Sequence, residues 1–191
     1  ILPRFSCELA ASLSDFEKRM LQMFYITVFQ EAADWRSHTT QANMQLLADS
    51  PIMMHELYAL LALNLERIDF IDQPVPLGFD CPLDLHCTYT RDQILIAMDY
   101  MTPKNVREGV KWLPDKQVDV FFITLNKADK DYSPTTMYND YSINESLFHW
   151  QSQSTTSDTA STGQRYINHR QRGSKVVLFV REFKQDSIGA A

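Results

Sequence analysis

The sequence has little cysteine, little glycine and no long apolar run, and each shortage excludes a class of protein. Its three cysteines, Cys7, Cys81 and Cys87, are an odd number at irregular spacing, so we expect free thiols in the reducing cytoplasm rather than a disulfide framework. No apolar run approaches the roughly 20 residues of a membrane helix, and the N-terminus lacks a signal-peptide pattern. The five glycines form no phosphate-binding loop, so we expect no nucleotide and no other cofactor in this chain.

The chain does have enough apolar material for a folded core, and its charge is unevenly distributed. Of its 191 residues, 45% are hydrophobic and 22% are charged, which suits one core of ordinary size or two small ones. Residues 1–80 carry five basic and eleven acidic groups, whereas residues 81–191 carry 13 of each sign. Within the second part, residues 164–184 hold six basic groups and one acid, a net charge of +5. Such a basic segment in an acidic chain can attract a polyanion locally.

The first 75 residues are predicted to form three packed helices, because apolar residues recur at spacings of three and four. Ser14 and Glu17 have the spacing of a capping box, so the first helix begins there and is expected to run to about Asp34. A shorter helix is expected over 40–48, and Ser50 followed by Pro51 marks the start of the third. Two of these helices carry an apolar stripe that is expected to face the core: Phe16, Met20, Met23, Phe24 and Val28 on the first, and Met54, Leu57, Leu61, Leu65 and Ile68 on the third.

A stretch rich in proline and glycine, 72–82, is predicted to separate a helical unit (1–75) from a mainly antiparallel β domain (76–191). The second domain is expected to contain one short helix, which follows a capping box at Thr90. Strands are predicted at 110–113, 118–125, 147–153 and 176–183; those at 118–125 and 176–183 are apolar at nearly every position, as in strands buried on both faces. Because no long crossover helix separates the strands, the predicted fold class is α+β, with the helical unit packed on a small antiparallel β-sheet or barrel.

Three segments of the second domain carry residue types that suit nucleic acid. In a predicted strand over 148–153, apolar and polar side chains alternate, as in either a half-buried strand or a recognition face. After a loop at 154–162, basic and aromatic residues are interleaved, as in either a binding surface or a solvated basic hairpin. The long turn that begins near Lys127 is the third segment. The candidate nucleic-acid-binding residues are Lys127, His149, Trp150, Gln151, Gln153, Arg165, Tyr166, His169, Arg170 and Arg172.

A catalytic function and a protein-contact function remain open as alternatives. His86, His149 or His169 could serve as the general base of a nuclease-type hydrolase, and a structural module for protein contacts is the third possibility. Cys81, His86 and Cys87 are metal-ligating residue types, but they match no familiar zinc pattern, so no metal site is expected. Glu182 and Lys184 have the spacing of a nuclease motif, yet roughly one acid-x-Lys triplet is expected by chance in this composition.

From residue 82 onward the sequence resembles an uncharacterised domain of large bacterial proteins. The strings PLDLHCTYTRDQIL, REGVKWLPDKQVDVFFITLNKADKDYSPTTMYNDYSI, LFHWQSQSTTS and TGQRYINHRQRGSKVVLFVRE carry the resemblance. The similar domain lies at the C-terminal end of proteins that join an HKD, phospholipase-D-like nuclease module to a superfamily II helicase, some of them labelled type III restriction subunits. The resemblance extends more loosely into the helical part.

The resemblance implies a parent protein that binds DNA, hydrolyses ATP and acts in restriction or defence. Its helicase and nuclease modules would precede Ile1 and would be partners of this chain, which has neither a Walker loop nor an HKD motif of its own. By analogy with other restriction proteins, a barrel of the PUA or SRA kind is the specific guess for the β domain. We therefore expect a DNA-recognition or target-sensing module that is not itself an enzyme and contacts no membrane.

Overall fold

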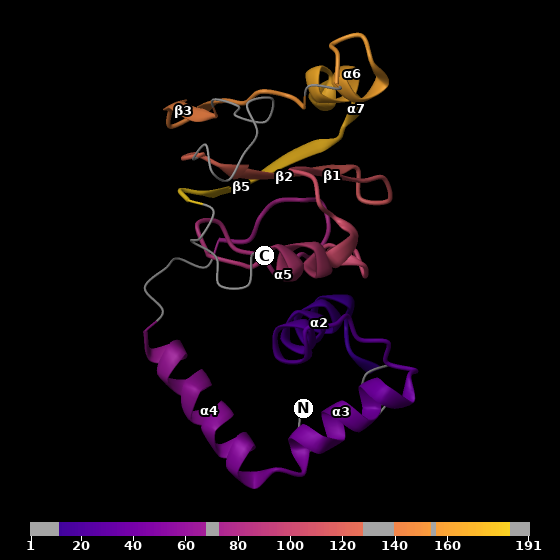
Figure 1. Cartoon of the computed structure of the whole chain (residues 1–191), viewed down its shortest axis with the longest axis vertical. Helices are drawn as coiled ribbons and strands as arrows, with labels where there is room; N and C mark the ends of the chain where they lie inside the picture. Colours follow the sequence, from indigo (N-terminus) through magenta and orange to yellow (C-terminus); the bar gives the residue numbers. More distant parts are fainter. Residues whose placement is uncertain (1–11, 68–72, 128–139, 154–155, 184–191) are drawn as a thin grey trace. The chain divides into compact units, whose positions relative to one another are not determined.

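The computed structural model describes residues 12–67, 73–127, 140–153 and 156–183 (Figure 1). The chain divides into two compact units, Ile1–Pro103 and Lys104–Ala191, which we call the helical unit and the sheet unit. The domain boundary expected after residue 75 is a statement about which segments fold independently, and it stays a prediction.

Within its described residues the helical unit contains four α-helices, and three of them begin at the N-caps that the sequence predicts. These helices are α2 (Asp15–Phe29), α3 (His38–Ala48), α4 (Pro51–Glu66) and α5 (Arg91–Ala97). Ser14 caps α2 in a reciprocal capping box with Glu17, Ser50 caps α4, and Thr90 caps α5. These side-chain oxygens accept bonds from N–H groups that the first helical turn leaves unpaired, which is why short polar residues start the helices.

The first helix ends five residues earlier than the predicted end near Asp34. Gln30 adopts the left-handed conformation with φ of 60°, and its N–H donates to the carbonyl of Ile26. The chain then returns along α2, so that Ala33 joins Leu21, Tyr25 and Met44 in a buried core. A non-glycine residue in this conformation is uncommon, which explains why no stop signal is visible in the sequence at this point.

Five of the nine described residues in the two apolar stripes predicted to face the core are exposed, so that prediction was wrong for most of their length. Phe24 of α2 does pack against the core, and Ile68 lies outside the described residues. Phe16, Met20 and Val28 of α2 are 40%, 51% and 41% exposed, while the opposite side of the helix, with Leu21 and Tyr25, is buried. In α4, Met54 is the single buried residue of the helix. Apolar spacing identifies a face of a helix, but it cannot choose between two apolar faces when both are present.

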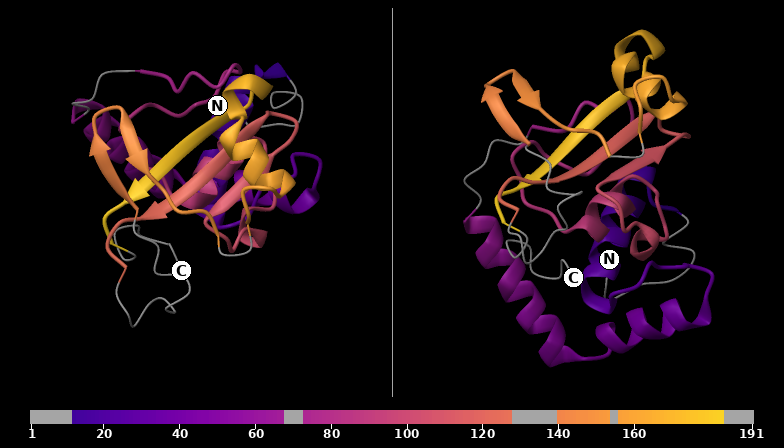
Figure 2. Two further views of the ribbon diagram at one scale, coloured as in Figure 1. Left: turned by 90° about the horizontal axis from the view of Figure 1, so that it is seen from above. Right: turned by 45° about the horizontal axis from the view of Figure 1, so that its top comes forward.

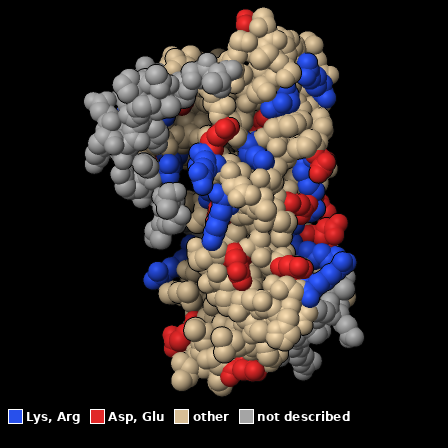
Figure 3. All heavy atoms as spheres, turned by 45° about the vertical axis from the view of Figure 1, so that its right-hand side comes forward, with Lys and Arg blue, Asp and Glu red and all other residues tan. Residues whose placement is uncertain are grey.

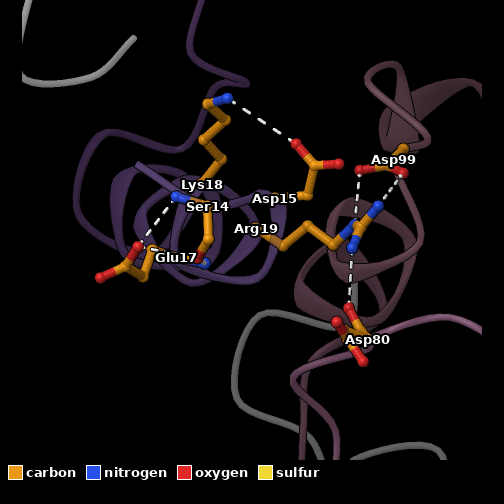
Figure 4. A network of polar contacts seen from close by, with 7 residues as sticks. All are labelled: Ser14, Asp15, Glu17, Lys18, Arg19, Asp80 and Asp99. Atoms are coloured by element: carbon orange, nitrogen blue, oxygen red, sulfur yellow. Dashed lines mark hydrogen bonds and ion pairs between the residues drawn. The ribbon is translucent and has the colours of Figure 1, made fainter. Parts of the chain in front are cut away.

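A buried arginine joins α2 to the end of α5 (Figure 4). Arg19 is 8% exposed and donates from Nε and Nη2 to the two carboxylate oxygens of Asp99, each at 2.9 Å. Its Nη1 donates to the carbonyl oxygen of Asp80 at 2.7 Å. The hydrogen bonds to Asp99 raise the pKa of Arg19, so the guanidinium stays charged. The turn that follows α5 is therefore fixed to α2.

The sheet unit is built on a three-stranded sheet of mixed direction (Figure 2). The strands are β1 (Val110–Leu113), β2 (Val118–Thr124) and β5 (Lys175–Arg181), in the order β1-β2-β5, with β1 antiparallel and β5 parallel to β2. A separate hairpin joins β3 (Tyr141–Asn144) and β4 (Leu147–His149), and two short helices, α6 (Ser161–Ile167) and α7 (His169–Arg172), precede β5. Val118 and Val120 of the central strand are fully buried.

The structure confirms the α+β class and corrects three details of the sheet unit. The sheet is mixed, rather than antiparallel as expected, because the hairpin and two short helices together supply a parallel crossover without a long helix. Within the described residues β1 and β5 are edges, so the sheet is not closed into a barrel of the PUA or SRA kind or any other. As an edge strand, β5 exposes Leu178 and Val180 instead of being buried on both faces.

Two further secondary-structure predictions for this unit were wrong, and both assigned β-structure to residues that form no strand. The strand expected over 147–153 ends at His149, and residues 164–172, considered as a hairpin, are helical. The predicted β domain (76–191) therefore contains α6 and α7 in addition to the one short helix expected there, which is α5. Among the described residues, no single helix is both long and apolar enough to span a membrane, and α3 with α4 passes that test only as a pair bent by 82°.

Candidate nucleic-acid interface

A fully buried carboxylate, that of Asp119 in β2, lies at the base of the candidate site. Asp119 is 0% exposed, and its two oxygens accept hydrogen bonds from Nε and Nη2 of Arg165 at 2.8 and 2.9 Å. Moving a charged group out of water costs several kcal/mol unless the charge is paired. The bidentate hydrogen bonds from Arg165 therefore offset the cost of burying the Asp119 carboxylate in the central strand. The pair joins β2 to α6.

Aromatic rings surround this ion pair on one face of the sheet. The Arg165 guanidinium carbon lies 4.3 Å from the ring centroid of Trp112 and 5.3 Å from that of Tyr166. The ring of Trp150 lies 4.2 Å from that of Phe121, and Tyr166 meets both edge-on at 5.4 and 5.3 Å. We call this set the Arg–aromatic cluster; its members are Trp112, Asp119, Phe121, Trp150, Arg165 and Tyr166.

The strand register explains why these residues meet. Trp112 lies opposite Asp119 in the antiparallel pair, so both side chains are on the same face, and Phe121 follows Asp119 on that face two residues later. Gly163 lets the chain just before α6 pack directly on the helix, because a Cβ at that position would clash with the backbone of Ser157. The close packing at this position therefore requires a residue without a side chain.

The cluster is electrostatically neutral at physiological pH. Hydrogen bonds from Arg165 to Asp119 raise the pKa of the arginine, which therefore remains a cation paired with its carboxylate. Burial raises the pKa of Tyr166 above its ordinary value near 10, so the phenol remains protonated. One of the six basic groups in 164–184 is therefore already matched by an internal acid.

Exposed cations lie next to the cluster, on α7. Nδ1 of His169, the first residue of α7, is 2.8 Å from the carbonyl oxygen of Tyr166, which ties the helix to the cluster. Arg170 and Arg172 are exposed, and the helix ends at Gly173 in the left-handed conformation with φ of 71°. Lys175 then opens β5. Figure 3 shows one face of the molecule, on which basic and acidic side chains are interspersed, so on that face any attraction for a polyanion is local.

The remaining candidate residues lie outside the cluster. Nζ of Lys127 pairs with Asp140 at 2.6 Å, both side chains being nearly buried, and the other oxygen of Asp140 accepts the backbone N–H of Gln151 at 3.0 Å. His149 stacks on Tyr141 across the hairpin, with ring centroids 4.8 Å apart. The amide of Gln153 donates to Glu108 at 3.4 Å.

The structure thus brings together three candidates, Trp150, Arg165 and Tyr166, and places His169, Arg170 and Arg172 beside them. Sequence reasoning missed Trp112, Asp119 and Phe121, which complete the cluster. One signal was available: Asp119 interrupts an otherwise apolar strand, and a charge in such a strand needs a buried partner. Of the histidines of the catalytic alternative, His86 is exposed in the helical unit, and His149 and His169 make the contacts given above.

Comparison with known proteins gives one match. Residues 83–191, more than half of the chain, match the family model described as "Domain of unknown function (DUF3427)". Neither the curated proteins nor the solved structures gave a match.

Proposed function

Because the chain belongs to the DUF3427 family, whose description names no activity, we infer its function from the site. We propose that the sheet unit binds DNA through α7 and the start of β5. The observation that carries the proposal is the pair of exposed arginines, Arg170 and Arg172, on a helix tied to the Arg–aromatic cluster. Cations next to half-buried aromatic rings are the residue types that contact phosphates and stack on bases.

The cluster supports the proposal by its rigidity. The pairing of Arg165 with Asp119 fixes α6 on the sheet, and α7 follows α6 directly, so Arg170 and Arg172 are held at a defined place. Cations on a rigid support lose less side-chain freedom on binding than cations on a mobile loop. Arg165 itself is matched by Asp119, so in this proposal it acts as a positioning residue and the phosphate contacts come from α7.

Trp150 and Tyr166 are the candidates for base contacts. Both are half-buried, and each already packs against Phe121. A ring held on one side by the protein can offer its other side to an unpaired base, and such stacking is worth roughly 1–3 kcal/mol per base. Single-stranded DNA should therefore bind at least as well as duplex DNA.

The salt dependence of DNA binding tests the proposal. Fluorescence anisotropy with labelled single-stranded and duplex DNA, measured at several salt concentrations, gives the slope of log K against log salt. Replacing Arg170 or Arg172 by Ala should make that slope shallower by about 0.9 for each duplex phosphate that is no longer neutralised, and should weaken all sequences alike. Trp150→Phe and Tyr166→Phe keep an aromatic ring and should retain most of the affinity, whereas Tyr166→Ala should lower it without changing the slope.

Arg36→Ala is the matched control, because Arg36 is also exposed but belongs to the helical unit. It removes the same charge and should leave the slope unchanged. If Arg36→Ala changes the slope as much as Arg170→Ala, binding is diffuse electrostatics and α7 is not the site. If the wild-type chain shows no salt-dependent binding at low ionic strength, the DNA proposal fails and the protein-contact alternative takes its place.

We further propose, from the resemblance in sequence, that this module serves an ATP-dependent helicase and nuclease in restriction or defence. Target recognition by a separate module fits such a protein, because a helicase motor holds the DNA backbone and needs another part to select the site. The nucleotide sequence upstream of the codon for Ile1 tests this directly: helicase motifs and an HKD motif should be encoded there in frame.

A further inference from the structure

An exposed carboxylate, that of Glu108, lies at the edge of the Arg–aromatic cluster. Glu108 precedes β1 by two residues, and the carbonyl oxygen of the next residue, Gly109, accepts a hydrogen bond from the N–H of Phe122 at 2.8 Å. The start of β1 is therefore anchored on the central strand. Trp112 and Val110 share the face of the sheet that carries the cluster, and Glu108 is the next residue in that alternation.

Two observations place the Glu108 carboxylate beside the rings that are proposed to contact bases. Its Oε2 accepts a hydrogen bond from Nε2 of Gln153 at 3.4 Å, and Gln153 follows Trp150 by three residues. Burial is the main cause of the raised pKa of Tyr166, and the negative charges of Asp119 and then of Glu108 add to it. The carboxylate is therefore close enough to the Tyr166 phenol to act on it electrostatically.

The Glu108 carboxylate has acceptor capacity that the described chain does not use. An ionised carboxylate accepts about four hydrogen bonds, and within the described residues Gln153 is its one hydrogen-bond donor. No described lysine, arginine or histidine forms an ion pair with it. Unlike Asp119, whose oxygens are occupied by Arg165, Glu108 is exposed and can accept hydrogen bonds from a ligand.

A carboxylate at a DNA-binding surface repels phosphates, so the parts of a DNA strand that it favours are base edges with N–H groups. Cytosine, adenine and guanine each carry an exocyclic amino group, which donates to a carboxylate. Thymine has no amino group, and its N–H lies between two carbonyl oxygens that a carboxylate repels. A carboxylate beside a base-stacking ring therefore distinguishes thymine from the other bases.

We propose that Glu108 makes the DNA-binding site selective for bases that carry an amino group, by accepting a hydrogen bond from that group. The inference rests on the DNA binding proposed above, in which a base of a single strand stacks on Trp150 or Tyr166. Gln153 is then a positioning residue, because its amide holds the carboxylate at the edge of the cluster. The arginines of α7 contact phosphates and set the affinity, whereas Glu108 adds the choice among bases.

The affinities for two single-stranded homopolymers, oligo-dC and oligo-dT, test this selectivity. They have the same phosphates and a pyrimidine ring of the same size, so they differ at the base edge. In fluorescence anisotropy at one low salt concentration and neutral pH, the wild-type chain should bind oligo-dC about tenfold more tightly, as expected for one hydrogen bond to a charged group. Glu108→Gln should reduce the ratio of the two affinities to about one, since an amide can donate to thymine as well as accept from cytosine.

Glu145→Gln is the matched control, because Glu145 is an exposed glutamate of the same unit, in the turn between β3 and β4. It removes the same charge and should leave the ratio of the two affinities unchanged. Both glutamates are exposed, so both variants should keep the wild-type circular dichroism spectrum.

Equal affinity of the wild-type chain for the two oligomers would overturn this inference and leave the proposed function intact. The same holds if Glu108→Gln strengthens binding of both oligomers and keeps the wild-type ratio, because Glu108 would then act only as a repulsive charge. It also holds if Glu145→Gln changes the ratio as much as Glu108→Gln does. A wild-type chain that binds neither oligomer at low ionic strength would overturn the proposed function and this inference together.

Discussion

Asp119 shows most directly how a single residue determines the candidate site. It is a charged residue in the buried centre of β2, and it is tolerated because Arg165 supplies two hydrogen bonds. The same pair fixes α6, and through α6 it fixes the arginines of α7. A residue with no access to solvent is therefore proposed to control a binding surface that it does not touch.

Replacing Asp119 by Val should destabilise the chain by about 3 kcal/mol, since Arg165 is left with a largely buried, unmatched charge. The Arg165 side chain retains 17% exposure, which lets water compensate part of the loss. The double variant Asp119→Val, Arg165→Met should be more stable than Asp119→Val alone, because it removes both charges. Urea denaturation monitored by fluorescence measures the three free energies of unfolding. Equal stability of wild type and Asp119→Val would contradict this account of the pair.

Tyr166 should make the stability of the sheet unit fall at high pH. Burial raises its pKa in the folded chain above the ordinary value of 10.0. The folded state therefore disfavours the phenolate. The contribution of Tyr166 to the free energy of unfolding is fully present below pH 10 and is lost as the pH rises through the folded-state pKa. Thermal unfolding of wild type and Tyr166→Phe between pH 8 and pH 11, roughly spanning this range, should show a steeper decline for the wild type. Parallel declines would show that the phenol is as well hydrated as in the unfolded chain.

At the scale of the element, α6 depends on Gly163. A Cβ there would clash with the Ser157 backbone, which lies just before the helix, so Gly163→Ala cannot keep the present packing. We expect a destabilisation of about 2 kcal/mol, as for other overpacked sites. The intrinsic preference of helices for alanine over glycine opposes this effect by up to about 1 kcal/mol, so a net loss of stability would have to come from the clash.

Gly173→Ala offers a second comparison at the end of α7. Its positive φ disfavours a side chain, but a Cβ would meet nothing within 4 Å. It should therefore cost only about 1 kcal/mol, the strain of the left-handed conformation. Denaturation curves of the two variants should rank Gly163→Ala as the more damaging, and the reverse order would show that α6 can shift freely.

The sequence predicted elements well where local signals act and poorly where packing decides. Ser14, Ser50 and Thr90 mark three helix starts because a cap needs only neighbouring N–H groups, which lie within three residues. The end of α2 at Gln30 and the exposure of Phe16, Met20 and Val28 depend on which face of the helix meets the rest of the unit. That is a long-range property, and spacing alone does not contain it.

The candidate site was predictable in its types of residue but not in its geometry. The basic and aromatic composition of 164–172 was evident, yet the hairpin considered there was wrong because short helices without side-chain caps leave little local signal. The pairing of Asp119 with Arg165 joins residues 46 positions apart. Only the parallel placement of β5 and its preceding helices beside β2 brings them together.

At the scale of the whole molecule, the contacts within the helical unit predict where the chain can be divided. Arg19 of α2 bonds to Asp99 after α5, and the Thr27 hydroxyl accepts a hydrogen bond from Gln93 of α5 at 2.8 Å. The segment between the predicted boundary and α5 is also packed, since Leu77 and Cys81 are 5% and 4% exposed. Division after residue 75 would separate all of these partners.

We therefore expect a fragment of residues 1–103 to unfold cooperatively on heating and a fragment of residues 1–75 not to do so. The shorter fragment loses Asp99 and leaves the Arg19 guanidinium, 8% exposed in the intact unit, without the carboxylate that compensates its burial. It also loses the apolar cover that α5 gives to α2, because Ile94, Leu95 and Ile96 of that helix are almost fully buried. Circular dichroism melting of the two fragments provides the measurement, and the variant Asp99→Ala in the longer fragment separates the two causes: it should lower the melting temperature while preserving a single transition. A cooperative transition in residues 1–75 alone would instead place the folding boundary before α5, where the prolines and glycine first indicated it.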